Sequence, residues 1–113
     1  MAVSPGYRAF VVEQLQVIGR VTARAMFGGV GLYHESLFFG LIADDTLYLK
    51  VDDLSRGHYE RAGMRSFRPY GDGGPSMSYF ELPAEVLEDR EELRLWVERA
   101  LGAARRKGRR RRT

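Results

Sequence analysis

Apolar residues at helical spacing mark both ends of the chain. Near the N-terminus they recur every three or four positions and define one helix face: Tyr7, Phe10, Val11, Leu15 and Ile18. Ser4 can cap the free amides ahead of them, and Pro5 suits the first helical position because its missing N–H would be unpaired there anyway. The pattern predicts a helix over residues 5–18 that ends at Gly19.

A second stripe lies near the C-terminus. Asp89 opens it, with Glu92 three residues later in the capping-box position. The apolar residues that follow are Leu93, Trp96, Val97, Ala100, Leu101 and Ala104. We predict that this helix face packs on a sheet, with Trp96 as its largest anchor.

Between the helices the pattern changes to short β-type runs. Residues 21–27, 32–34, 37–42 and 47–51 read as strands, with turns at residues 35–36 and 44–45. The glycine-rich stretch 28–31 predicts a sharp bend or bulge.

A short helix is predicted to follow, capped by Asp52 or Asp53 and ended by Gly63. Two further strands are expected at 66–70 and 77–81, joined by a flexible loop at 71–75. The elements together predict an α+β domain.

Composition limits the class of protein. A chain of 113 residues with 44% hydrophobic residues suits one domain with one core. The absence of cysteine rules out disulfides and thiolate metal sites, which favours a reducing compartment, and we expect a cytoplasmic protein. No signal-peptide pattern and no apolar run of about 20 residues is present, so no membrane association is expected.

The positive charge is concentrated at the end of the chain. Residues 105–113 hold seven of the 18 basic residues and no acid, leaving 11 basic against 15 acidic residues, a net charge of −4, for the remainder. We therefore predict a domain at 1–104 and a basic, disordered tail at 105–113. Its cations could bind phosphates, or serve only solubility. The candidate nucleic-acid residues are Arg105, Arg106, Lys107, Arg109, Arg110, Arg111 and Arg112.

Templates for catalysis, cofactors and metals all fail. The glycine cluster lacks the third glycine of a dinucleotide fingerprint and the lysine-serine pair of a P-loop. His34 and His58 are far apart and have no short-spaced partner ligand. Ser76 and Ser78 lack a nucleophile elbow. We therefore predict no catalytic residue, no cofactor and no metal.

Tyrosines in the predicted strands leave two interpretations open. With Lys50 nearby they could stack nucleic-acid bases, but the basic and aromatic spacing of an RNA-recognition motif is missing. Packing across strands is favoured for Tyr33, Tyr48 and Tyr79.

Four blocks together resemble the N-terminal domain of the TfoX (Sxy) competence-regulator family: AMFGGVGLY at 25–33, FFGLIA at 38–43, LYLKVD at 47–52 and MSYFELP at 77–83. The resemblance covers about residues 7–101. The motif residues, interpreted as structural, are Met26, Phe27, Gly28, Gly29, Gly31, Tyr33, Tyr48, Lys50 and Tyr79.

The resemblance implies a five-stranded, mainly antiparallel sheet in the order α-β-β-β-α-β-β-α, similar to secretion chaperones, and no enzyme. Known members carry a second, helical domain, which we do not expect here, and promote transcription of competence genes with the cyclic-AMP receptor protein. Its leading implication is a non-enzymatic regulatory module that binds a protein, with the transcription machinery as a candidate partner and homodimerisation as an option. The alternatives are a nucleic-acid accessory protein acting through the tail, and a small enzyme whose site is assembled from distant residues.

Overall fold

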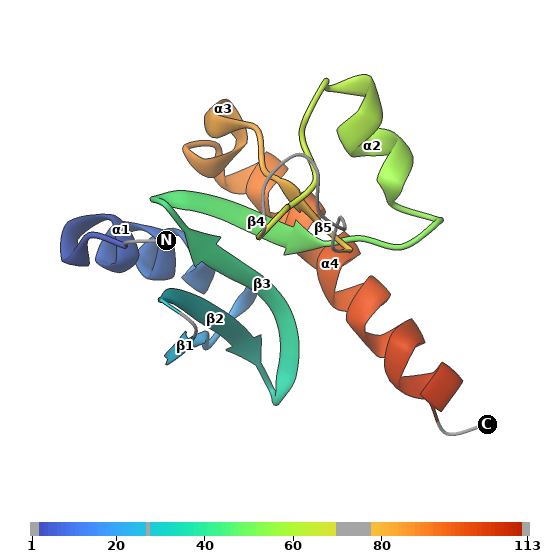
Figure 1. The fold of residues 1–113 in the computed structure, drawn as a ribbon, viewed down its shortest axis with the longest axis horizontal. Coiled ribbons are helices and arrows are strands. Elements are labelled where there is room, and N and C mark those ends of the chain that lie inside the picture. Colours follow the sequence, from blue (N-terminus) through green and yellow to red (C-terminus); the bar gives the residue numbers. More distant parts are fainter. Residues whose placement is uncertain (1–2, 27, 70–77, 112–113) are drawn as a thin grey trace.

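Five strands form one antiparallel sheet in the order β1-β2-β3-β4-β5, with helices packed on one side of it (Figure 1). The computed structural model describes residues 3–26, 28–69 and 78–111. The elements are α1 (Pro5–Leu15), the 3₁₀ helix η1 (Gln16–Ile18), β1 (Thr22–Met26), β2 (Gly29–His34), β3 (Leu37–Ala43), β4 (Thr46–Lys50), α2 (Arg56–Arg61), β5 (Tyr79–Glu81), α3 (Ala84–Leu87) and α4 (Arg90–Arg111).

The predicted α+β class and the five-stranded antiparallel sheet are confirmed. The implied order placed three strands before the middle helix and two after it. In the structure, four strands precede α2 and one follows it. A strand was expected at 66–70, but residues 66–69 provide only an isolated bridge between Ser66 and Phe80, and residue 70 lies outside the described residues. Pro69 lacks the N–H that a longer ladder would need. The loop expected at 71–75 lies outside the described residues.

Two tight turns hold the β2–β3 and β3–β4 hairpins. Glu35 and Ser36 have φ values of 50° and 70°, and Asp44 and Asp45 both have 50°. Left-handed φ at both central residues is the geometry of a two-residue turn whose twist matches that of the flanking strands. Both predicted turns are therefore confirmed.

The glycine-rich stretch is mostly strand, which corrects the predicted bend. Only Gly28 turns the chain, with φ at 80°, while Gly29 and Gly31 lie within β2. A Cβ at Gly29 would come within 2.6 Å of the Ile42 carbonyl oxygen, and one at Gly31 within 2.6 Å of the Met26 methyl carbon. These two glycines allow close approach of neighbours. The pairing register between β2 and β3 shifts after this stretch, between Leu32 and Tyr33 of β2.

The caps of the two long helices follow the sequence prediction. The Ser4 hydroxyl accepts from the Tyr7 amide at 3.3 Å, and the Asp89 carboxylate accepts from the Glu92 amide at 3.2 Å. The middle helix starts later than predicted, at Arg56. Asp52 instead organises the turn before it, since its carboxylate accepts from the amides of Leu54 and Ser55. The one-turn helix α3 was not predicted.

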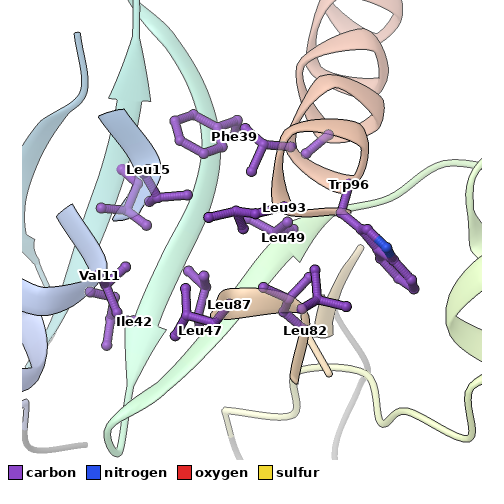
Figure 2. Packing of buried hydrophobic residues seen from close by; sticks show 14 of the residues in the cluster. Val11, Leu15, Phe39, Ile42, Leu47, Leu49, Leu82, Leu87, Leu93 and Trp96 are labelled. Carbon is purple, nitrogen blue, oxygen red and sulfur yellow. The ribbon is translucent and has the colours of Figure 1, made fainter. Parts of the chain in front are cut away.

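The core lies between the inner face of the sheet and the helices α1, α3 and α4 (Figure 2). All six apolar residues of the predicted C-terminal stripe are buried, with Leu93 and Val97 fully inaccessible. Trp96 is 8% exposed and meets the Tyr59 ring edge-on at 4.8 Å. The Tyr59 hydroxyl is buried and has no hydrogen-bond partner among the described residues, and burial raises its pKa above the ordinary value.

Trp96→Ala is expected to destabilise the domain by about 3 kcal/mol or more, because it removes the largest side chain of the α4 contact and leaves a cavity. Leu95→Ala is the matched control, since the neighbouring Leu95 is 46% exposed and should cost little. Thermal or urea unfolding measures both variants. Equal stability of the two would contradict packing of this helix face on the sheet.

Candidate nucleic-acid interface and the surfaces of the sheet

The basic segment begins as a continuation of α4. The helix runs to Arg111 without a break at residue 104, so residues 105–111 have helical backbone where a disordered tail was expected. Arginine and lysine favour helices, and cations near a helix C-terminus interact favourably with the helix dipole. Ala103 and Ala104 are still buried, whereas Arg105 and Lys107 are exposed. The domain boundary at 104 stays a prediction.

Arg106 is tied to the body. Its Nε lies 2.5 Å from Oδ2 of Asp52, 54 residues earlier, and both side chains are partly buried. The hydrogen bond from Arg106 holds the pKa of Asp52 below its ordinary range. Asp52 also orders the turn before α2, so this pair links the end of α4 to the loop after β4. Sequence alone predicted Arg106 as one of the nucleic-acid-binding cations and Asp52 as a cap.

Arg106→Gln is expected to lower stability by about 1 kcal/mol at neutral pH, because it leaves the partly buried Asp52 carboxylate without its ion partner. The lowered Asp52 pKa means that this contribution exists while the carboxylate is ionised and is lost as pH falls through its folded pKa. Thermal melts at neutral and acid pH measure the difference. Arg105→Gln is the control, and an equal effect of both variants would contradict a specific pair.

A row of aromatic rings crosses the outer face of the sheet, the face opposite the helices. Tyr33 of β2 stacks on Phe38 of β3 with centroids 5.1 Å apart, and Phe38 meets Tyr79 of β5 at 5.6 Å. We call Tyr33, Phe38 and Tyr79 the ring row. The Arg24 guanidinium lies over Tyr33 at 5.4 Å, and the Lys50 ammonium lies over Tyr79 at 4.8 Å. Two cations therefore flank the row.

The two ends of the ring row differ in accessibility. Tyr79 and Lys50 are 7% and 5% exposed, and burial raises the pKa of Tyr79 to about 12. Tyr33 and Phe38 are only partly buried, and Arg24 is exposed. Tyr48 packs separately, on Phe67 at 4.9 Å. All three tyrosines considered from sequence thus contact another ring, and only the Tyr33 end opens to solvent.

The outer edge of β1 is a second exposed feature. Among the residues that the structure describes, β1 pairs only with β2 and ends the sheet, and its residues are exposed or partly exposed. Nη2 of Arg8 donates to the Ala23 carbonyl at 3.3 Å, as expected for a carbonyl that points away from β2. Since backbone direction alternates along a strand, Ala25 presents its N–H and C=O on the same free side.

Two hollows lie beside the sheet. A cleft of about 340 Å³ is formed by α1, the β3–β4 turn and α3, with Tyr7, Phe10 and Leu87 among its apolar residues and Glu81 and Glu88 among its acids. A more open depression of about 750 Å³ is lined by residues that include Tyr48, Arg65, Ser66 and Arg68. Neither combines a nucleophile, a histidine base and a carboxylate.

Both histidines have structural surroundings. Nδ1 of His34 lies 2.7 Å from the Arg20 carbonyl, to which it can donate. His58 lies beside the Trp96 ring, and burial with the nearby Arg99 lowers its pKa. Across the described residues, no three histidine, aspartate or glutamate side chains gather as metal ligands.

A single antiparallel sheet packed on its inner face by a terminal pair of helices, α1 and α4, defines the class of this protein. Residues 13–104 match the family model described as TfoX N-terminal domain, and the chain belongs to this family. The predicted family is therefore confirmed.

The chain is also similar to a protein named DNA transformation protein TfoX1, from Aliivibrio fischeri (strain ATCC 700601 / ES114). The two are 37% identical over 51 residues. The match covers 45% of this chain and 24% of the relative, so the chain spans about a quarter of that protein.

In the part of the chain that the structure describes, no helix is both long enough and apolar enough to cross a bilayer.

Proposed function

We propose that this domain is a non-enzymatic, cytoplasmic regulatory module that binds a partner protein, as a contribution to the competence-related role of its family. The open edge of β1 carries the proposal. An extended segment of a partner can add to such an edge as a sixth strand, with main-chain hydrogen bonds giving affinity. Membership of the TfoX N-terminal domain family supports a place in competence regulation, where the transcription machinery is a candidate partner.

The charges around this edge define the preferred partner. Arg8 and Arg24 lie at the edge, and Arg20 lies two residues before the first residue of the strand. An acidic extended segment would complement them. A second copy of this chain fits less well, because antiparallel pairing of β1 with itself would bring two Arg24 side chains close together.

Ala25→Pro should abolish binding at this edge. It removes an N–H on the free side of β1 and leaves the ladder to β2 intact, whereas the matched control Ala25→Val keeps the N–H. The three proteins serve as baits for quantitative affinity purification from the native host. Partners retained by the wild type and Ala25→Val but lost with Ala25→Pro support the proposal. Identical profiles for all three folded baits would overturn it, as would turnover of a metabolite by the pure domain.

Nucleic-acid binding by the basic segment is the second candidate function, supported by the helical continuation of α4 into its cations. Helical backbone would present successive cations in a regular arrangement, and neutralised phosphates would release counterions. The name of the relative, a DNA transformation protein, is consistent with a role close to DNA.

The test neutralises the cations other than Arg106, because Arg106 pairs with Asp52. The variant carries glutamine at positions 105, 107 and 109–112. Wild-type affinity for duplex DNA should fall with salt with a log–log slope as steep as about −5, and the neutralised variant should lose most of this slope. Unchanged affinity at low salt would rule out this function, and Arg8→Gln controls for a general loss of charge.

A further inference from the structure

The ring row has one closed end and one open end. Tyr79 and Lys50 form the closed end, while the open end carries the exposed Arg24 over the Tyr33 ring. We propose that this open end binds single-stranded nucleic acid, with an unpaired base stacking on Tyr33 and Arg24 contacting the adjacent phosphate.

The Arg24 guanidinium marks where the base would lie. It is a flat group 5.4 Å from the Tyr33 centroid, and Phe38 stacks on the same ring at 5.1 Å. A nucleobase is also flat, and stacking of bases on aromatic side chains is tolerant of base identity. Because Arg24 is exposed on an edge strand, its side chain can move aside and pair with a phosphate.

The charge of the sheet permits this contact even though the body as a whole is acidic. The five strands contain two cations, Arg24 and Lys50, and one acid, Glu81. The acids concentrate elsewhere, with five of the 15 in the eight residues 85–92. Those residues span α3, the two residues after it and the start of α4, in the helix layer on the other side of the sheet (Figure 1). The strand residues of this face therefore carry a small net positive charge, and the nearest acid outside the strands is Glu35 in the turn that follows β2.

The geometry favours an unpaired base over duplex. Bases within a duplex have both faces covered by their neighbours, so none can stack on Tyr33 without leaving the helix. In a single strand a base face is free, and aromatic stacking contributes to binding by about a factor of ten per ring. A preference for single strands thus separates this site from the basic end of α4, which would bind phosphates of either form.

The experiment uses the full chain with glutamine at positions 105, 107 and 109–112, so that the basic segment contributes little. The probe is a fluorescein-labelled oligothymidylate of about 12 nucleotides, within the usual range of such sites, titrated at low salt by anisotropy. Binding is expected to exceed that of a duplex of equal length. Tyr33→Leu is expected to weaken it about tenfold, and Arg24→Gln to reduce its salt dependence.

Two further variants keep the test decisive. Phe10→Leu removes a ring that is 39% exposed but lies on α1, and it should leave binding unchanged. Tyr33→Trp retains a stacking ring, so binding should persist, with fluorescence quenching by the oligonucleotide beyond any quenching of Trp96.

The proposal is overturned if folded Tyr33→Leu binds like its parent, if duplex binds equally well, or if the parent does not bind. It is also overturned if Tyr33→Leu weakens binding of a partner protein but leaves oligonucleotide binding unchanged. The β1-edge proposal is separate, since Ala25→Pro leaves the ring row in place.

Discussion

The packing of α4 on the inner face of the sheet is the contact on which the rest of the structure depends. Leu93 and Val97 are fully buried there, and Trp96 extends the contact to Tyr59 of α2. A sheet with one face covered has a defined inside and outside, because side chains alternate along each strand. The packing therefore leaves the Tyr33 end of the ring row, the β1 edge and the end of α4 available as surfaces.

Features set by near neighbours could be predicted from the sequence. The apolar stripe of α4 depends on a spacing of three and four residues, and the Asp89 cap on an amide three residues away. The Asp44-Asp45 turn likewise needs only two residues that tolerate left-handed φ. The family motifs extended this local information to the whole domain, because they fix the order of elements that spacing alone cannot connect.

Features that join distant residues could not be predicted. Asp52 and Arg106 are 54 positions apart, and the strong capping preference of aspartate gave a sufficient local explanation for Asp52. Gly31 was predicted to lie in a bend, whereas it allows the close approach of Met26. This contact forms only when β1 and β2 pair, so the sequence alone did not indicate it. The ring row also could not be predicted, since its members come from three different strands. Tyrosine positions alone left packing and binding open, and only the geometry shows that one end of the row is accessible.

The charge asymmetry of α4 has a physical role whether or not the domain meets nucleic acid. Acids at its start, Glu91 and Glu92, and cations at its end both interact favourably with the helix dipole. A basic C-terminus is therefore weak support for DNA binding by itself, and Arg106 shows that one cation already stabilises the fold. Truncation at residue 104 would combine the loss of this ion pair with any loss of phosphate contacts. Neutralising the other six cations while Arg106 stays in place separates the two, and this makes a binding result interpretable.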